Sequence, residues 1–272
     1  LRSLLTHFSK AKDFGITPEI YETFVENKRA VLDRIQGDAA DEFVRLEELS
    51  RAYHTYQKIL LEHDTLDFGD LLLRLKELMT RRPAVRTILQ KRFRHILVDE
   101  FQDTNRIQYE IIKDLTAGHE QITVVGDDDQ AIYAFRGASL KNILQFSTDY
   151  PDATQIVLTQ NYRSGQAILN RAHQFIQSNN PDRLEAEDPE RLSKRLKANV
   201  DFLGAVSHEH FATSEDEADG ITRMILREKE KDATLTWNDF AILVRSNDAA
   251  TSFVHSLSSV GIPHQFMAMR GL

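Results

Sequence analysis

The stretch HILVDEFQDTNRIQYEIIKDL, residues 95–115, decides the fold that the sequence predicts. It begins with a short apolar run, 96–98, that ends abruptly in the carboxylates of Asp99 and Glu100. Apolar residues then return every three or four positions over 107–115, the spacing of one helix face. A buried strand followed by an amphipathic helix is the repeating unit of a parallel α/β sheet.

The same alternation recurs downstream. The β-branched run 122–125 stops at Gly126 and three aspartates, and a helix is predicted over about 139–146. A third strand is predicted at 155–158, with a helix after Ser164. Later elements continue the pattern: strands at 206–211 and 240–244, a helix opened by the capping box of 214–217, and a helix over 251–260.

The N-terminal third predicts helices alone. Apolar residues recur at helical spacing from Phe43 to Leu60, and Thr17 and Pro18 suit the cap and first residue of an earlier helix. Further helices are predicted over about 68–79 and after Pro83. Between the α/β segments, the polar stretch from Asn179 to Asn199 predicts an exposed connection or a mobile loop.

The composition narrows the class of protein. The 272 residues hold no cysteine, which excludes disulfides, thiol catalysis and cysteine-based zinc sites. The ten histidines form no HxxxH or HExxH pair. No apolar run approaches the roughly 18 residues of a membrane span, and we expect a cytoplasmic protein with no membrane partner. The net charge of −8 neither indicates nor excludes nucleic acid, because a local basic or aromatic groove can bind a single strand.

Polar clusters follow three predicted strands, at the sheet edge where parallel α/β proteins bind ligands. Asp99 and Glu100 suit Mg²⁺ binding and deprotonation of a water, and nucleotide hydrolysis needs both. Gln130 can sense a terminal phosphate through its amide. Arg163 can reach a transferring phosphate, and its neighbour Tyr162 can stack on a purine.

Spaced aromatic residues follow Gln130. Tyr133 and Phe135, with Arg136 adjacent, suit stacking on bases, which contributes roughly 1–3 kcal/mol per base. Each cluster also has an ordinary explanation when taken singly. An acidic pair after a strand is commonly a solvated turn, two large rings are commonly core, and the turn of 161–164 is commonly a helix start.

Five stretches resemble, in order and spacing, segments of the UvrD/Rep family of superfamily 1 helicases. LVDEFQDTN, 97–105, resembles motif II, and VVGDDDQAIYAFRGA, 124–138, resembles motif III. LTQNYRS, 158–164, resembles motif IV. LDFGDLL, 66–72, is similar to the family's LDFDDLL segment, and SKAK, 9–12, to the start of its inserted helical subdomain.

The resemblance implies an ATP-dependent DNA helicase. Such a protein uses ATP and Mg²⁺ to move 3′ to 5′ along single-stranded DNA and to unwind duplex junctions in DNA repair or replication. Asp99 would coordinate Mg²⁺, Glu100 would activate the attacking water, and Gln130 would couple the γ-phosphate to the DNA site. The other implied contacts are adenine at Tyr162, phosphate at Arg163 as an arginine finger, bases at Tyr133 and Phe135, and a link to the nucleotide at Arg136.

The resemblance also implies an α/β fold of incomplete RecA-like parallel sheets, of the P-loop NTPase type, with an inserted helical subdomain. We expect residues 1–63 to form the helical insertion. Residues 64–150 would form the C-terminal part of the first RecA-like domain, with motifs II and III. Residues 151–272 would form the N-terminal part of the second, with motif IV.

The sequence departs from the family pattern in three places. No G-x-x-x-x-G-K-[ST] phosphate-binding loop occurs, and in the family this loop lies upstream, whereas motifs V and VI lie downstream. We therefore expect an internal piece that is inactive alone and exposes apolar surface where further strands should pack. Phe135 stands where motif III usually has Trp, and Gly69 stands where the LDFDDLL segment has Asp.

One alternative stays open: a non-hydrolysing helicase-like module that binds DNA or a partner protein. The presence of Asp99, Glu100, Gln130 and Arg163 favours the enzyme, because neighbouring carboxylates repel each other and have no other evident role. An unrelated Mg²⁺-dependent nuclease is disfavoured, because a further acidic cluster with a lysine is lacking.

Overall fold

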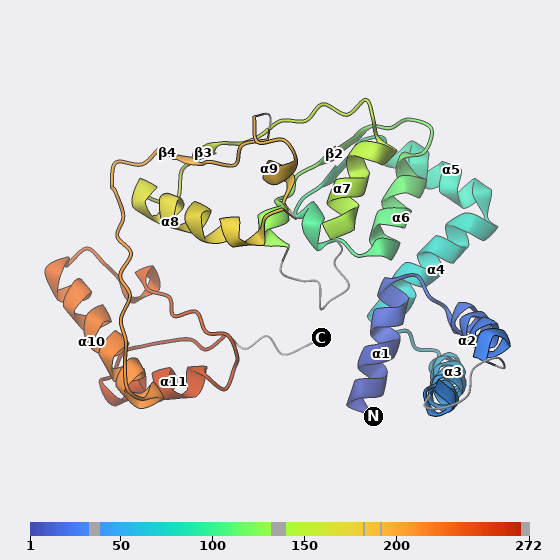
Figure 1. The fold of residues 1–272 in the computed structure, drawn as a ribbon, viewed down its shortest axis with the longest axis horizontal. Coiled ribbons are helices and arrows are strands. Elements are labelled where there is room, and N and C mark those ends of the chain that lie inside the picture. Colours follow the sequence, from blue (N-terminus) through green and yellow to red (C-terminus); the bar gives the residue numbers. More distant parts are fainter. Residues whose placement is uncertain (33–38, 132–139, 182, 191, 268–272) are drawn as a thin grey trace. The chain divides into compact units, whose positions relative to one another are not determined.

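The computed structural model describes residues 1–32, 39–131, 140–181, 183–190 and 192–267 (Figure 1). They form two compact units, Leu1–Phe202 and Leu203–Leu272. Each unit mixes helices with short extended segments, and strands occur in parallel pairs in the first unit. The fold is therefore mixed α/β with small parallel sheets, in agreement with the predicted class at that level.

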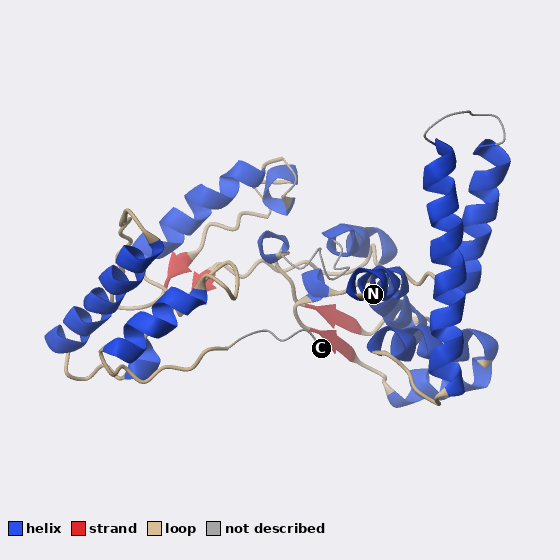
Figure 2. Cartoon of the chain, turned by 90° about the horizontal axis from the view of Figure 1, so that it is seen from below, coloured by secondary structure: helices blue, strands red, loops and turns tan. Residues whose placement is uncertain are grey.

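Five helices open the described chain, in agreement with the prediction that its N-terminal third is helical, and the sequence predicted four of them individually. They are α1 (Arg2–Asp13), α2 (Pro18–Leu32), α3 (Ala39–Glu62), α4 (Phe68–Arg81) and α5 (Pro83–Arg92). Pro18 begins α2, and the Thr17 hydroxyl accepts a hydrogen bond from the Ile20 amide at 3.4 Å. Helices α2 and α3 lie side by side (Figure 2).

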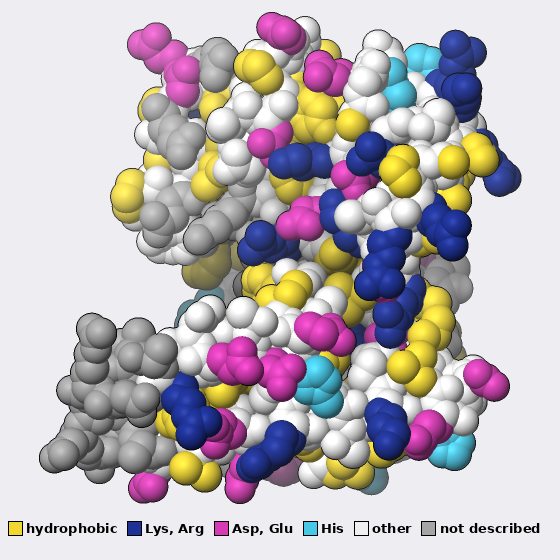
Figure 3. Space-filling model, turned by 90° about the vertical axis from the view of Figure 1, so that its right-hand side faces the viewer, with side chains coloured by type: hydrophobic (Ala, Val, Ile, Leu, Met, Phe, Trp, Pro, Cys, Tyr) yellow, Lys and Arg dark blue, Asp and Glu magenta, His cyan; other side chains and the backbone are white. Residues whose placement is uncertain are grey.

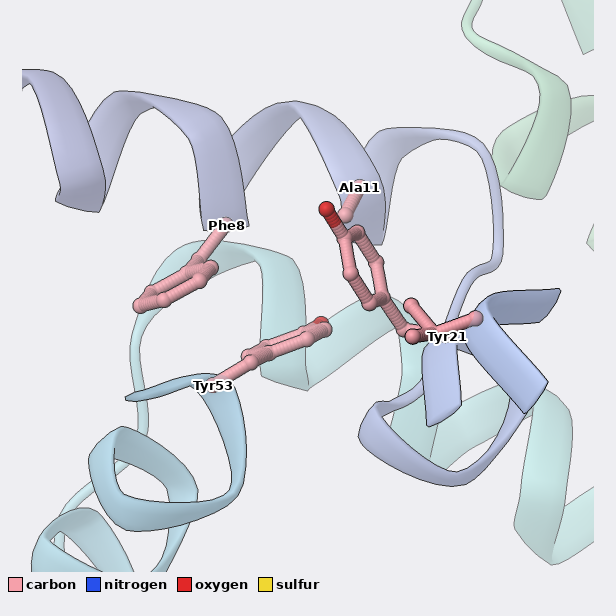
Figure 4. Close-up of a cluster of buried hydrophobic side chains, with 5 residues drawn as sticks. Phe8, Ala11, Tyr21 and Tyr53 are labelled. Carbon is pink, nitrogen blue, oxygen red and sulfur yellow. The ribbon is translucent and has the colours of Figure 1, made fainter. Parts of the chain in front are cut away.

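Aromatic side chains close a core between α1, α2 and α3. The rings of Phe8 and Tyr53 stack with centroids 4.6 Å apart, and Tyr21 meets Tyr53 edge-on at 6.1 Å (Figure 4). Tyr53 is fully buried, and its hydroxyl donates to the Ile16 carbonyl at 2.9 Å, so the polar atom of this buried side chain has a partner.

A buried lysine joins this core to α4. Lys12 is 0% exposed, and its ammonium lies 2.7 Å from Asp67 and 2.9 Å from Asp70. Asp67 caps α4 by accepting from the Asp70 amide. Burial disfavours ionisation of Asp67, but hydrogen bonds from Lys12, the Asp70 amide and Tyr56 outweigh it and lower its pKa. Gly69 permits this approach, because a Cβ there would lie 2.8 Å from Lys12 Cβ.

The first strand pair lies at the motifs that the sequence singled out. Strand β1 (Ile96–Val98) pairs in parallel with β2 (Ile122–Val124), with Val98 opposite Val124. Helices α6 (Arg106–Thr116) and α7 (Leu140–Asp149) follow the two strands, and short 3₁₀ turns, η1 (Phe101–Asp103) and η2 (Asp128–Gln130), precede them. Met79 of α4 packs with Ile107 and Ile111 of α6.

The second strand pair differs from the prediction. Strand β3 is Gln160–Asn161, paired in parallel with β4 (Lys197–Ala198), whereas residues 155–158 form no strand. No described strand pairs with this run, so its backbone has no partner that would make it a strand. Its side chains are open as well, since Ile156 and Leu158 are 77% and 73% exposed.

The segment after β3 contains more regular secondary structure than predicted. Helix α8 (Gln166–Ile176), turn η4 (Gln177–Asn179) and short helix α9 (Leu184–Glu187) precede β4. The expectation of an exposed connection from Asn179 to Asn199 was wrong, because Arg183 and Leu192 are buried within it. Helix α8 begins at Gln166, after the cap residue Gly165, which confirms the prediction of a helix after Ser164.

The unit Leu203–Leu272 contains α10 (Ser214–Lys231), turn η5 (Trp237–Asp239) and α11 (Ala250–Ser259). Thr213, not Ser214, caps α10 by accepting from the Asp216 amide at 3.0 Å. The strands predicted at 206–211 and 240–244 are wrong, because described residues 203–267 contain no paired strand. Helices α10 and α11 pack together, and Ser256 donates to Asp219 at 2.6 Å.

Apolar side chains lie exposed at strands and at the apolar runs that form none, which confirms the expectation of open apolar surface. Leu97 of β1 is 78% exposed, and Leu243 is 94% exposed. Within the described residues, no helix has the length and apolarity to cross a membrane.

Candidate functional site

Two neighbouring strand ends build the candidate site. The Val125 amide donates to the Val98 carbonyl at 2.8 Å, and the Phe101 amide donates to the Val125 carbonyl at 2.9 Å. These bonds continue the β1–β2 ladder one step beyond the strands. Asp99 and Glu100 at the end of β1 therefore lie beside the turn of 126–130 that follows β2.

Glu100 adopts an unusual backbone conformation at this edge. Its φ of 48° and ψ of 45° are left-handed, which costs a non-glycine residue on the order of 1–3 kcal/mol. Asp99 accepts the Glu100 amide at 3.0 Å through its side chain, which favours the bend. Both side chains are exposed, so the bend presents two carboxylates to solvent beyond the strand.

Gln102 joins the ends of β1 and β2 through two side-chain hydrogen bonds. Its Nε2 donates to Glu100 Oε2 at 2.6 Å, and its Oε1 accepts from the Asp127 amide at 3.0 Å. Gln102 is 1% exposed. Gly126 leaves room for this amide, because a Cβ there would lie 3.0 Å from Gln102 Oε1.

Motif II also anchors the helix that follows it. Asn105 caps α6 in a reciprocal pair with Gln108, and its Nδ2 donates to Asp13 of α1 at 2.9 Å. Burial raises the pKa of Asp13 to about 6, against the lowering effect of the Asn105 hydrogen bond. The site edge is thereby fixed to the N-terminal helices through α6.

Gln130 is held by the acidic turn that precedes it. Its Nε2 donates to Asp127 Oδ2 at 2.8 Å, and the Asp129 amide donates to Asp127 Oδ1 at 3.2 Å. The structure thus brings Glu100 and Gln130 to one edge and links them through Gln102 and Asp127.

Cations from the downstream segment neutralise this turn. Lys194 lies 2.7 Å from Asp127 and also contacts Asp128 and Asp129. Arg183 is 3% exposed and meets both oxygens of Asp129, at 2.6 and 2.7 Å. Burial raises the pKa of Asp127, but bonds from Lys194 and Gln130 outweigh this effect and lower it. The three carboxylates lie close enough together to hold a metal ion. In this structure the ammonium of Lys194 lies among them and supplies the positive charge instead.

Asp99 has a carboxylate of the kind that can hold Mg²⁺. Its carboxylate is exposed at the strand end, and one oxygen accepts the Glu100 amide. The other oxygen accepts no hydrogen bond from the described residues. An oxygen of that kind is the ligand type that Mg²⁺ prefers, so the donor set fits the ion.

The motif IV residues are placed separately. Asn161 Oδ1 accepts from the amides of Arg163 and Ser164, at 3.0 and 2.8 Å, which shapes a turn after β3. Tyr162 is 71% exposed, and Arg163 is exposed. Among described residues, no hydrogen bond or ion pair joins either side chain to Glu100 or Gln130. Tyr133, Phe135 and Arg136 lie outside the described residues.

Sequence reasoning overlooked Gln102, Arg183 and Lys194. Gln102 stood inside a quoted motif but carried no assigned role, and only the contact with Asp127 shows what it does. Arg183 and Lys194 are separated from the acidic turn by more than fifty residues, and no local pattern in the sequence pairs them.

A basic stretch of surface contrasts with the acidic chain. Figure 3 shows a face on which Lys and Arg side chains gather. Residues 74–94 hold one acidic residue, Glu77, against eight cations: Arg74, Lys76, Arg81, Arg82, Arg86, Lys91, Arg92 and Arg94. Arg74 and Arg81 pair with Glu77, and Lys76 pairs with Asp114, so the local excess of positive charge comes from the other five cations.

Carboxylates follow one parallel strand and an amide-bearing turn follows the next, which is the edge where α/β proteins commonly bind ligands. Two family models match the chain: the UvrD/REP helicase N-terminal domain over residues 3–151, and the UvrD-like helicase C-terminal domain over residues 156–271. The chain belongs to the UvrD/Rep helicase family.

Three similar relatives carry the name ATP-dependent DNA helicase PcrA. The Staphylococcus aureus (strain Mu50) protein is 37% identical over 79% of this chain and 28% of its own length. The Bacillus subtilis protein is 40% identical over 70% and 24%, and the Leuconostoc citreum protein is 33% identical over 98% and 32%. The chain thus spans about a third or less of the relatives it matches.

Proposed function

We propose that the chain is part of an ATP-dependent DNA helicase that moves 3′ to 5′ along single-stranded DNA and unwinds duplex junctions during repair or replication. The observation that carries the proposal is the linked placement of Glu100 and Gln130 at one strand edge. Family membership and relatives named as ATP-dependent DNA helicases support it.

In this proposal, residues 64–150 and 151–272 belong to two RecA-like domains, and residues 1–63 form the helical insertion. The short parallel pairs β1–β2 and β3–β4 are parts of those sheets. Nucleotide would lie at the strand edge, between motif II and motif IV. A phosphate-binding loop from elsewhere in the protein would complete the site.

The residues of motifs II and III would divide the chemistry. Asp99 would hold Mg²⁺, which when bound neutralises phosphate charge. Glu100 would accept a proton from the attacking water, and its exposed position suits contact with solvent. Gln130 would donate its amide to the terminal phosphate, and its bond to Asp127 holds that amide at the strand edge.

The remaining predicted site residues would contact the nucleotide or the DNA. Arg163 would stabilise charge on the transferring phosphate, and the exposed ring of Tyr162 would stack on adenine. Tyr133 and Phe135 would stack on bases of the single strand, and Arg136 would connect them to the nucleotide. These five assignments rest on the resemblance and on residue chemistry.

The substitution Glu100→Gln in the full-length protein tests the proposal. It keeps size and hydrogen bonding but removes the base, so kcat for ATP should fall by about 100-fold or more, with nucleotide affinity unchanged. DNA-stimulated ATPase and binding of a non-hydrolysable ATP analogue measure the two effects. Glu110→Gln, at a partly exposed position of α6, is the matched control and should hydrolyse ATP as the unmodified protein does.

Near-normal turnover by Glu100→Gln would remove Glu100 as the base. A full-length protein that binds DNA but hydrolyses no ATP would instead support the non-hydrolysing module. The first outcome rejects a residue assignment, and the second rejects the enzymatic function.

A further inference from the structure

We propose that Gln102 is a positioning residue that sets the Glu100 carboxylate for catalysis and ties it to the turn carrying Gln130. The inference rests on the proposed function, since it assigns Glu100 the role of base. It adds a residue that touches neither nucleotide nor DNA but acts through Glu100.

The amide of Gln102 can point in only one direction. The Asp127 backbone N–H can only donate, so the atom 3.0 Å from it must be the amide oxygen. The amide nitrogen must then face Glu100, where it donates to Oε2 at 2.6 Å. A flipped amide would oppose two donors at one end and two acceptors at the other. The orientation follows from the partners themselves.

Burial makes both hydrogen bonds costly to lose. Gln102 is 1% exposed, so water has little access to its amide to replace a missing partner. Gly126 packs against the same amide, and a Cβ there would also lie 3.3 Å from Phe101 and from Ile143. The end of β2 is therefore shaped around Gln102, which leaves it little freedom to move.

Glu100 depends on this bond for its position. Its backbone is in the left-handed region and its side chain is exposed. Among described residues, Gln102 is the one side chain that donates a hydrogen bond to its carboxylate. Without that donor, the carboxylate would rotate freely about its side-chain torsions. A misplacement of about 1 Å in a catalytic group can lower a rate by roughly 100-fold.

The connection extends to the proposed phosphate sensor. Gln102 holds the Asp127 amide, and Asp127 Oδ2 accepts from Gln130 Nε2 at 2.8 Å. Three hydrogen bonds therefore connect Glu100 to Gln130, and Gln102 and Asp127 are the two residues between them in this chain of bonds. A shift of the turn at 126–130 would reach the Glu100 carboxylate directly through the Gln102 side chain.

Two substitutions in the full-length protein separate the halves of this connection. Gln102→Glu keeps an oxygen that accepts from the Asp127 amide, but it presents a carboxylate to Glu100 where a donor stood. Gln102→Met keeps approximate size and removes both bonds. Gln90→Met is the control, because Gln90 also donates a part-buried side-chain hydrogen bond, to the Asp114 carbonyl near the C-terminal end of α6.

Three measurements are made for each variant: steady-state kinetics that give kcat and KM for ATP, binding of a non-hydrolysable ATP analogue, and hydrogen exchange of the peptide that spans 126–130. Gln102→Glu should keep the exchange rate and the analogue affinity, while kcat falls about 10- to 100-fold with KM changed less than about twofold. Gln102→Met should lower kcat similarly and also speed exchange. Gln90→Met should change none of the three.

A purely structural role would give a different pattern. Gln102→Glu with kcat within about twofold of the unmodified protein would overturn the proposal, even if Gln102→Met were unstable or unfolded. Glu100→Gln, measured in parallel, separates this failure from that of the proposed function. An inactive Glu100→Gln beside an active Gln102→Glu rejects Gln102 alone, whereas an active Glu100→Gln rejects the base itself.

Discussion

The N-terminal helices and the strand pairs bury their apolar side chains to very different extents. Phe8 and Tyr53, in α1 and α3, are 1% and 0% exposed. Leu97 of β1 is 78% exposed, and the apolar run before β3 is open as well. The same chain thus contains a closed core and two open sheets.

The contrast follows from where each element makes its backbone hydrogen bonds. A helix satisfies them internally, so a few amphipathic helices close a core once their apolar stripes meet. A strand needs neighbours on both edges and cover on both faces. The candidate site lies at the open β1–β2 pair, whereas the closed helical core lies away from it and holds no assigned functional residue.

The largest effect is expected from breaking the closed part. Lys12→Met should leave Asp67 and Asp70 without their buried cation and lower the free energy of unfolding by about 3–5 kcal/mol. Urea unfolding followed by circular dichroism measures the change. Lys10→Met, on the exposed side of the same helix, should change it by less than about 0.5 kcal/mol. Equal losses in both variants would mean that the buried network does not hold α1 to α4.

The closed part is also the one that the sequence predicted best. Periodicity from Phe43 to Leu60 lies within α3, and Thr17 and Pro18 mark the start of α2. Helical spacing and caps are local signals, so they survive whatever the rest of the chain does. The tie from Lys12 to Asp67 was missed, because it joins residues 55 positions apart.

Strands were predicted less well for a physical reason. The apolar runs at 155–158, 206–211 and 240–244 signal a need for burial but not the partner that supplies it. In the described chain, no strand pairs with them, and they form none. The run at 96–98 succeeded because β2 lies beside it.

The residues of the candidate site also differ in how well the sequence predicted them. Motif resemblance indicated Asp99, Glu100 and Gln130, and the structure brings Glu100 and Gln130 to one edge. Gln102 lay inside a quoted motif but had no predicted role. Arg183 and Lys194 lay in a segment that was predicted to be an exposed connection or a mobile loop. Their partners are fixed by tertiary contact, which no spacing in the sequence encodes.

A smaller effect is expected where the two parts meet, at Asp13 of α1 and Asn105 of α6. Burial raises the folded pKa of Asp13 to about 6, above its ordinary value of 3.8. Protonated Asp13 therefore favours the fold fully below pH 3.8, and that contribution is lost as the pH rises through 6. Asp13→Asn should raise the free energy of unfolding by about 1 kcal/mol at pH 7.5, after allowance for solvent screening.

The gain from Asp13→Asn should disappear as the pH falls from 6 to below 4, because the native carboxyl becomes neutral by itself. Urea unfolding at pH 7.5, 6 and 4 measures the trend. Asp152→Asn, at an exposed position, controls for the loss of one negative charge. A gain that stays constant with pH would show that Asp13 is not destabilised by burial at the junction.

The smallest effect is expected at the open sheet, and it tests the comparison most directly. Leu97→Ser should change the free energy of unfolding of this chain by less than about 0.5 kcal/mol, because 78% of Leu97 is already in water. We propose that further strands cover this face in the longer protein, where the same substitution should cost about 2–3 kcal/mol through lost burial. Urea unfolding of both forms measures the difference.

A large cost in this chain would mean that Leu97 is already buried in solution, for instance against a second copy. A small cost in both forms would mean that the β1 face stays open, and the contrast between the two regions would then belong to the fold itself rather than to the lack of covering strands.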